Sequence, residues 1–324
     1  MQQTIIDRYL CCPVDKSYPL VLQDAEVQGT EVKSGYLRCP SCGHCYPIVA
    51  GIPQMFPPSH VQATEAAEAK SAEAEVRNAE VMTYDAQWTD YPTKIEFEAM
   101  LKALNIRKGE VVVELGAGTG RLTTVLSRLG PTILALDIAS RSLELNRSKC
   151  EKIPGADVHF IAADACFLPL RDSVGDKVAS SQLLEHIPTE PERQRLAHEA
   201  RRVLKQGGVL ALTTYNFSWT KRRYGDREGF HNKRERTFYY FRYKREELRE
   251  LFRAGGFEVK SVTGLLNLSK GQESPALDRL VAMIPPVAAL TGHLLFIVAR
   301  PHPLGARAGL HETTGERRWA VGSR

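Results

Sequence analysis

Three glycines at alternate positions, Gly116, Gly118 and Gly120, follow a run of apolar residues that ends in Glu114 and Leu115. A strand that enters such a turn, with a helix after it, lets the backbone N–H groups approach a ligand closely, because glycine has no side chain. A nicotinamide or flavin dinucleotide requires the third glycine one position later, where Arg121 stands. The turn therefore predicts a ligand site that is not a dinucleotide site.

Acidic residues follow the next two predicted strands, as Asp137-Ile138 and Asp164-Ala165. We expect Asp137 to accept hydrogen bonds from both hydroxyls of a ribose and Ile138 to pack against adenine, whose amine and ring nitrogen fit Asp164 and the backbone of Ala165. Glu114 would repel a pyrophosphate, but it attracts the ammonium and sulfonium groups of S-adenosylmethionine. These strand ends predict an S-adenosylmethionine site, with Gly116, Ala117, Gly118 and Gly120 as its turn.

Cysteines crowd the beginning of the chain, where five of the seven fall within the first 45 residues. The pairs Cys12 with Asp15 and Cys39 with Cys42 have the spacing of two metal knuckles, which suits tetrahedral zinc, although carboxylate is a less common zinc ligand than thiolate. The first ten residues lack a secretory signal, so we expect a cytoplasmic protein and metal rather than disulfides. A structural zinc and a metal-free module both stay open.

An alternation of strands and helices must position these residues. Strands are expected at 111–115, 132–136, 158–162, 177–181, 209–214, 257–263 and 294–299, with helices between them, which predicts an α/β fold with a parallel sheet. The apolar stretch 280–298 is broken by Pro285, Pro286 and Gly292, so no integral membrane span is expected. The expected organisation is a β-rich module (1–58), a solvated helical linker (59–83), the α/β domain (84–304) and a disordered tail (305–324).

Four segments carry a resemblance to class I S-adenosylmethionine-dependent methyltransferases of the small-molecule type: 112–120, 164–169, 184–187 and 199–208. The resemblance implies a Rossmann-like seven-stranded sheet with an antiparallel last strand, methyl transfer from S-adenosylmethionine, and contact of Ser181 with the methionine part of that ligand. Residues 45–53 resemble the zinc-ribbon-like domain of tRNA-methyltransferase activators, which implies protein docking through the module.

His186 and Glu185 lie just after the fourth predicted strand and are the nearest candidates for a catalytic base. The other interpretation is that both residues open a helix and pack in the interior. Both interpretations stay open at this point.

The net charge of +5 is concentrated in residues 221–253, which include a basic and aromatic lid insertion at about 216–244. Such a segment serves either as a lid over a small-molecule or lipid-like acceptor or as a surface that stacks bases and neutralises RNA phosphates. We expect a small-molecule acceptor, with RNA as the alternative. A non-catalytic protein that binds S-adenosylmethionine or a partner is the third class.

Overall fold

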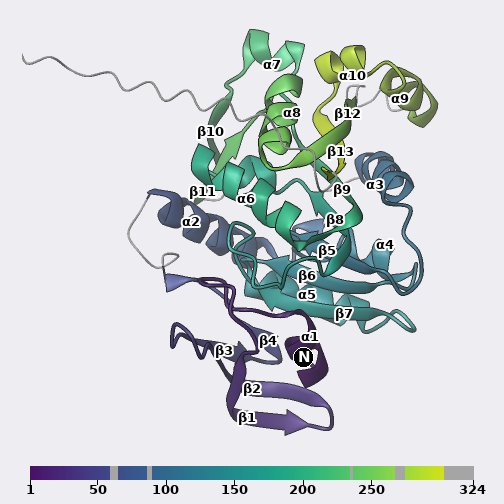
Figure 1. The fold of residues 1–324 in the computed structure, drawn as a ribbon. Helices are drawn as coiled ribbons and strands as arrows, with labels where there is room; N and C mark the ends of the chain where they lie inside the picture. The colour runs from purple at the N-terminus through teal and green to yellow at the C-terminus, as the bar shows by residue number, and fades with distance from the viewer. Residues whose placement is uncertain (59–64, 86–89, 234–235, 267–273, 303–324) are drawn as a thin grey trace, which may run out of the picture.

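The computed structural model describes residues 1–58, 65–85, 90–233, 236–266 and 274–302. The predicted tail at 305–324 lies outside the described residues. Figure 1 shows a small β-rich module below a larger α/β domain, with several short helices at the opposite end. The predicted α/β class and the small N-terminal module are both confirmed.

Seven strands form the main sheet in the order β12–β13–β9–β8–β5–β6–β7. Their bounds are Val111–Leu115 (β5), Thr132–Asp137 (β6), Asp157–Ala162 (β7), Gly175–Ser181 (β8), Leu204–Tyr215 (β9), Phe257–Leu265 (β12) and Leu294–Pro301 (β13). The strands from β9 to β7 pair in parallel, whereas β13 is antiparallel to both β9 and β12. All seven predicted strands and the antiparallel last strand are confirmed.

Helices cover both faces of this sheet because successive side chains of β5 point to opposite sides. Val112 packs with Phe97 and Met100 on one face, whereas Val113 packs with Leu196 and Phe252 on the other. The first face is covered by α3 (Asp90–Leu104), α4 (Thr123–Ser127) and α5 (Ser140–Cys150), and the second by α6 (Glu190–Val203) and α8 (Arg245–Ala254). The sheet is thus buried on both faces, as its continuous apolar strands require.

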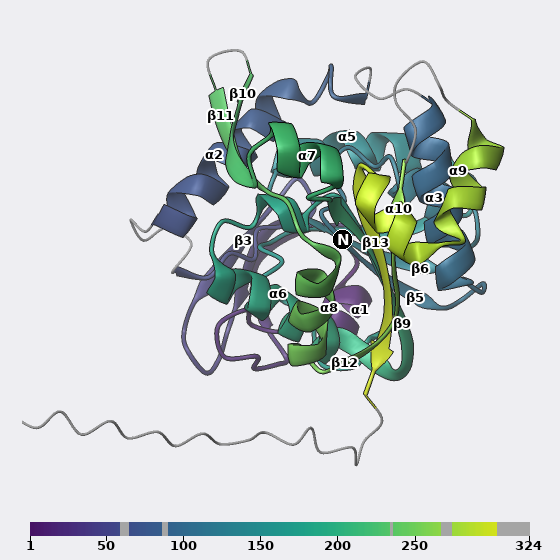
Figure 2. The same cartoon turned by 90° about the horizontal axis from the view of Figure 1, so that it is seen from above.

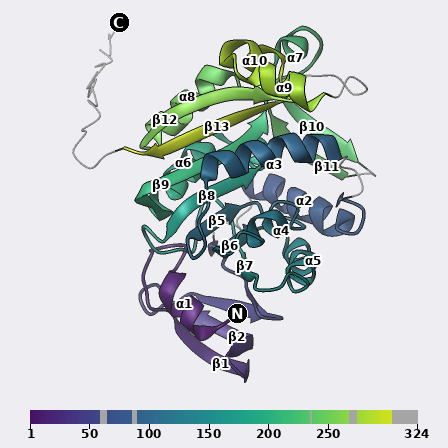
Figure 3. The same cartoon turned by 90° about the vertical axis from the view of Figure 1, so that its right-hand side faces the viewer.

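The N-terminal module consists of a helix and a four-stranded antiparallel sheet: α1 (Gln3–Tyr9), β1 (Val21–Gln28), β2 (Glu31–Arg38), β3 (Cys45–Val49) and β4 (Ile52–Pro53). Ile6 and Leu10 belong to the same apolar cluster as Leu170 of the domain. The Met55 N–H donates to the Ala162 carbonyl at 2.7 Å, next to the carboxyl end of β7. Figure 3 shows the module at the β7 side of the sheet, so the two parts share one core.

Helix α2 (Glu65–Glu80) occupies the segment that the sequence suggested was a solvated linker. The helix is present, but the expectation that it is solvated is wrong. Lys70 is 4% exposed, Glu73 is 7% exposed and Val76 is buried, because α2 packs across the carboxyl end of the sheet and against β11. Figure 2 shows α2 beside the β10–β11 hairpin.

The remaining elements gather around the carboxyl ends of the strands. They are the 3₁₀ turn η3 (Leu184–His186), α7 (Trp219–Tyr224), the hairpin of β10 (Glu228–Lys233) and β11 (Arg236–Phe241), α9 (Pro275–Ala282) and α10 (Pro285–Thr291). Among the described residues, no helix has both the length and the apolar character that crossing a membrane requires.

Candidate active site

The glycine turn after β5 is held against the end of β6. The N–H groups of Gly116 and Ala117 both donate to the Leu136 carbonyl at 2.9 Å, and Gly118 N–H donates to Asp137 Oδ2 at 2.8 Å. Gly116 and Gly118 have φ values of +74° and +50°, which favour glycine. The turn therefore exposes its backbone to a pocket at the carboxyl edge of the sheet.

The backbone of Gly120 packs closely against α5. A Cβ at this position would lie 2.2 Å from Asn146 Oδ1 on α5, and Gly120 does not line the pocket. It has no side chain because the turn and α5 pack closely there. Gly120 lies outside the pocket for this reason, and its contact with the ligand stays a prediction.

Residues from four strand ends line one pocket, as expected. Those that the sequence suggested are Gly116, Gly118, Asp137, Ile138, Asp164, Ala165 and Ser181. Asp137 Oδ1 accepts the Ala139 N–H at 2.8 Å, and burial raises the pKa of its carboxyl above the usual value. A partly buried carboxylate with capacity for further donors suits the hydroxyl groups of a ribose.

Glu114 lies in a smaller hollow beside this pocket, together with Ala117. Its side chain is fully inside the protein, and burial raises its pKa to about 8. Glu114 Oε2 has no hydrogen-bond partner among the described residues. The carboxyl group is thus largely protonated at neutral pH until a cation or a donor arrives.

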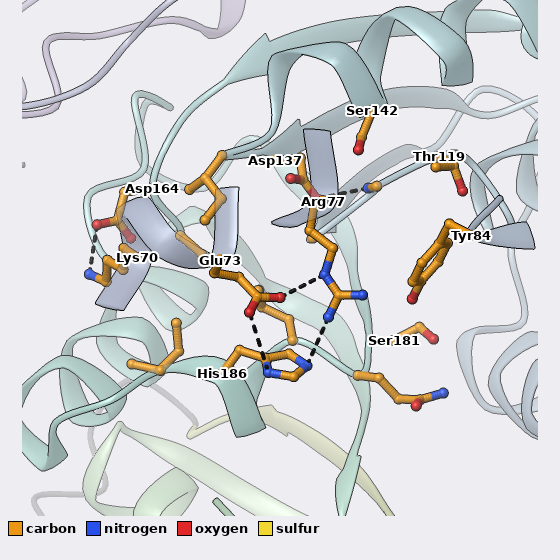
Figure 4. A pocket seen from close by; sticks show the side chains of 17 residues that line it. Lys70, Glu73, Arg77, Tyr84, Thr119, Asp137, Ser142, Asp164, Ser181 and His186 are labelled. Carbon is orange, nitrogen blue, oxygen red and sulfur yellow. Dashed lines mark hydrogen bonds and ion pairs between the residues drawn. The ribbon is translucent and has the colours of Figure 1, made fainter. Parts of the chain in front are cut away.

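Helix α2 supplies three charged residues to the pocket that sequence reasoning missed: Lys70, Glu73 and Arg77 (Figure 4). Lys70 Nζ lies 2.7 Å from Asp164 Oδ2 and also pairs with Glu192. Arg77 Nε lies 2.6 Å from Glu73 Oε1. The three residues recur at i, i+3 and i+7, the spacing of one helix face, which was the available signal.

His186 faces the pocket and is held on both sides of its ring. Nδ1 lies 2.8 Å from the Tyr239 carbonyl, which can only accept, so Nδ1 carries the proton. Arg77 Nη2 donates to the unprotonated Nε2 at 3.3 Å. Burial lowers the pKa of His186, although the nearby Glu73 opposes the shift. A neutral imidazole with its lone pair on Nε2 is the form that accepts a proton.

Glu185 does not line the pocket, although it precedes His186 in the chain. Both residues lie in η3, where successive side chains point about 120° apart because a 3₁₀ turn has about three residues. The Glu185 carboxyl instead accepts the Thr214 hydroxyl at 3.0 Å, and burial raises its pKa to about 8. Glu185 thus lies outside the pocket, and its role as a catalytic base stays a prediction that this position does not support.

Glu96 of α3 fixes two side chains at the end of β8, and no local pattern predicted this. Its Oε1 accepts the Ser181 hydroxyl at 2.7 Å, and its Oε2 accepts the Gln182 side-chain amide at 2.9 Å. Glu96 is completely buried. The position of Ser181 in the pocket is therefore fixed by a helix that lies before the glycine turn in the chain.

The four suggested metal ligands come together in the N-terminal module. One ligand atom from each of Cys12, Asp15, Cys39 and Cys42 lies within 4.8 Å of the others. Backbone N–H groups of Val14 and Cys42 donate to the sulfurs of Cys12 and Cys39, each at 3.4 Å. Three sulfurs and a carboxylate in such a cluster match the donor set of a tetrahedral zinc site.

The lid insertion forms the α7 helix and the β10–β11 hairpin. The ring of Phe238 lies 5.6 Å from that of His186, and Phe238 and Tyr240 are buried. Phe241 is also buried, between the guanidinium groups of Arg193 and Arg227 at 4.2 and 4.9 Å. These three rings are part of the interior and are not available to stack on bases.

Two family models match the chain. The model described as a methyltransferase domain matches residues 113–212, and the model described as Trm112p-like protein matches residues 9–51. The first match contains the glycine turn, Asp137, Asp164 and His186. The second contains the four clustered ligands.

Curated relatives match part of the chain. The demethylmenaquinone methyltransferase of Tropheryma whipplei is 29% identical over 132 residues, which are 41% of this chain and 49% of that protein. The malonyl-(acyl-carrier protein) O-methyltransferase of a Marinomonas species is 32% identical over 134 residues, 41% of this chain and 47% of that protein. The chain spans about half the length of the curated relatives it matches.

A solved structure with a similar fold belongs to the complex between the Trm112 methyltransferase activator of Haloferax volcanii and a methyltransferase. The similarity covers 70% of this chain and 98% of that one, with 18% identity and a TM-score of 0.51. At this level of identity it shows the fold alone.

Proposed function

We propose that this protein is a methyltransferase that moves the methyl group of S-adenosylmethionine to a small-molecule or lipid-like acceptor. The chain matches a methyltransferase domain model after a Trm112p-like model. The observation that carries this proposal is the convergence of the glycine turn, Asp137 and Asp164 on one pocket. The named relatives, which include a quinone and a malonyl-carrier methyltransferase, support the acceptor class.

The residues of the pocket fit S-adenosylmethionine. A Cβ at position 118 would lie 3.9 Å from Asp137 Oδ2, so glycine at this position leaves space beside the Asp137 carboxylate. Asp137 accepts the ribose hydroxyls, Ile138 packs on the adenine, and Asp164 with Ala165 binds its edge. Glu114 faces the cationic part of the ligand from the adjoining hollow. When bound, S-adenosylmethionine supplies a methyl group that its sulfonium activates for displacement.

Next to this pocket, Arg77 and His186 form the acceptor side of the site. The Arg77 guanidinium donates to His186 Nε2 at 3.3 Å and so occupies the lone pair of that nitrogen. Glu73 Oε2 has no hydrogen-bond partner among the described residues. An acceptor that bears a polar group displaces Arg77 from Nε2, places its nucleophile beside His186, and gives its proton to Nε2. The role of these residues is thus to align the nucleophile and remove its proton.

The buried rings of the hairpin favour a small-molecule or lipid-like acceptor over RNA. Phe238 and Tyr240 pack toward the pocket and the hairpin interior, which is the arrangement of a lid. A surface that binds single-stranded RNA needs exposed rings for successive bases, and of the rings described in this segment only Phe230 and Trp219, which lie on separate elements, are exposed.

In the N-terminal module, Cys12, Asp15, Cys39 and Cys42 would hold a structural zinc ion, and the donor set supports this assignment. The docking partner of the module is the methyltransferase domain of the same chain. Lys16 Nζ lies 2.7 Å from Glu199 Oε2, and Leu10 pairs with Leu170, which supports docking within one chain.

Calorimetry with S-adenosylmethionine tests the cofactor. The wild type binds, and Gly118→Arg does not, because the new side chain fills the ligand space. Gly155→Arg is the matched control, since Gly155 also has a positive φ, +73°, but a Cβ there meets nothing within 4 Å. A wild type that fails to bind S-adenosylmethionine rejects the proposal.

The acceptor is tested by incubating the protein with methyl-labelled S-adenosylmethionine and a cell extract separated into small molecules, lipids and RNA. We expect the label in the first or second fraction. Label that enters only the RNA keeps the methyltransferase but rejects the acceptor class.

A further inference from the structure

Two consecutive helices near the carboxyl edge of the sheet present a row of apolar side chains to the outside. On α9, α10 and the turn between them, six large apolar residues are exposed: Leu277, Leu280, Met283, Ile284, Val287 and Leu290. Met283 is 77% exposed and Leu280 59% exposed. Single exposed apolar residues are ordinary, but six on two adjoining helices mark an interaction surface.

The exposed residues of α10 cannot become buried by rotation of the helix, because its opposite side packs against β12. A Cβ on Gly264 would lie 1.8 Å from the Ala288 carbonyl, so the α10 backbone rests directly on β12. The Asn216 side-chain amide donates to the carbonyls of Ala289 and Gly292, at 2.8 and 2.7 Å. The exposed residues are therefore a fixed property of the fold.

Helix α7 adds an aromatic ring and positive charge beside this surface. It contacts α10, and all three views show the two helices side by side (Figures 1, 2 and 3). Trp219 is 56% exposed, and Arg222 and Arg223 are exposed as well. We call the outer sides of α7, α9 and α10 the apolar–basic face.

The charge of the apolar–basic face is one-sided. The three helices contain Lys221, Arg222, Arg223 and Arg279 and a single acidic residue, Asp278. Asp278 is only 1% exposed and accepts the Tyr91 hydroxyl at 2.7 Å, so its charge does not face outward. Arg279 pairs with Glu98 of α3, and the other three basic residues lie on α7.

We propose that the apolar–basic face docks this protein on the surface of an anionic phospholipid bilayer. Exposed leucine, isoleucine and methionine, a tryptophan at the rim and adjacent arginine and lysine are the composition of helices that lie in a membrane interface. The centres of protein–protein interfaces are instead rich in tyrosine, tryptophan and arginine, with few leucines and valines. Both apolar helices are too short to span a bilayer, so the protein binds at its surface.

The face lies close to the acceptor side of the candidate active site. His293 lies two residues after the end of α10, and its ring lies 5.8 Å from that of Tyr215, which in turn lies 6.0 Å from the ring of His186. Docking through α10 thus brings the pocket near the lipid surface. The docking itself does not depend on the proposed reaction and can be tested without it.

Sedimentation with vesicles tests the proposal. We expect the full chain to bind vesicles of phosphatidylcholine with phosphatidylglycerol and to bind pure phosphatidylcholine vesicles much more weakly. Leu280→Gln/Met283→Gln/Ile284→Gln abolishes binding to both. Arg222→Gln/Arg223→Gln weakens binding to the anionic vesicles about twenty-fivefold, at roughly fivefold for each interfacial basic residue.

Matched controls replace residues of the same types elsewhere. Val21→Gln/Val27→Gln/Val49→Gln changes three exposed apolar residues of the module, and Arg107→Gln/Lys108→Gln changes two exposed basic residues between α3 and β5. Both controls bind vesicles like the wild type. Thermal unfolding checks that every variant is folded. If the apolar variant does not fold, the arginine variant still tests the proposal.

Three outcomes overturn the proposal: a wild type that does not bind anionic vesicles, an apolar variant or an arginine variant that is folded and binds them as well as the wild type, or controls that lose binding equally. Self-association that the apolar variant abolishes, without vesicle binding by the wild type, assigns the face to a second copy of the chain instead.

Discussion

Lys70 Nζ lies 2.7 Å from Asp164 Oδ2, so a helix that precedes the glycine turn in the chain closes one end of the pocket. Lys70 also pairs with Glu192 at the start of α6. The side chain of Lys70 is only 5% exposed. Helix α2 thereby lines the pocket and also contributes a buried ion pair to the folded structure.

Removing Lys70 should destabilise the protein strongly. Lys70→Met leaves the carboxylates of Asp164 and Glu192 buried without their cation, which costs about 3 to 5 kcal/mol of the free energy of unfolding. Urea unfolding followed by circular dichroism measures the change. Lys260→Met is the control, because Lys260 pairs with Glu258 at the surface and its loss should leave the unfolding midpoint unchanged. Equal effects of the two substitutions would refute the buried network.

Binding of S-adenosylmethionine at pH 7 should release a proton from Glu114. The pKa of this carboxyl is raised to about 8 by burial, and a cation at the adjoining hollow lowers it again. Calorimetry in two buffers with different heats of ionisation measures the release, and Glu114→Gln abolishes it. A binding heat that is the same in both buffers for the wild type contradicts the assignment.

The same shift predicts how stability depends on pH. Because the folded-state pKa of Glu114 lies above its unfolded value of 4.5, the folded protein binds more protons between pH 4.5 and about 8. The contribution of Glu114 to stability is full below pH 4.5 and is lost as the pH rises toward 8. Glu114→Gln should therefore flatten the fall of the unfolding midpoint over this window, relative to the wild type.

His186 should limit activity on the acid side. Since burial lowers its pKa below the usual 6.5, protonation at lower pH removes the Nε2 lone pair, and kcat falls. His186→Asn keeps a donor for the Tyr239 carbonyl but loses the base, so kcat drops by a factor of about 10² to 10⁴ and the acid limb disappears. Glu185→Gln is the control, because Glu185 is outside the pocket and its carboxyl is largely protonated at neutral pH. If Glu185→Gln lowers kcat as much as His186→Asn, the assignment of His186 fails.

Zinc content should depend on Cys39 and not on Cys45. Cys39 belongs to the cluster with Cys12, Asp15 and Cys42, whereas Cys45 is exposed and lies outside it. Metal analysis of the purified protein should find zinc in the wild type and in Cys45→Ser, and none in Cys39→Ser. Loss of the ion should also lower the unfolding midpoint, because ligand binding adds to folding. A wild type without zinc settles the module as metal-free.

The strands, and the strand ends that line the pocket, were predictable from local patterns. The apolar run before Gly116 predicts β5, and acidic residues directly after strands predict side chains at one edge of a parallel sheet. Asp137, Asp164 and Ser181 indeed line one pocket. Gly120 followed the same pattern but packs against Asn146, because the sequence does not show which of several glycines faces a ligand and which faces a helix.

The burial of charged residues on α2 could not be predicted from local patterns. A segment rich in alanine and glutamate has the composition of a solvated helix, and its helical state followed from propensity alone. The burial of Lys70, Glu73 and Arg77 depends instead on partners far along the chain, Asp164 and His186. The pairing of His186 with Tyr239, and the turn that points Glu185 away from the pocket, are also products of packing. The residues at the strand ends were thus predictable from their neighbours in the sequence. The pairing of Lys70, Glu73, Arg77 and His186 depends on long-range contacts, because charge burial is decided by what the folded chain places opposite each side chain.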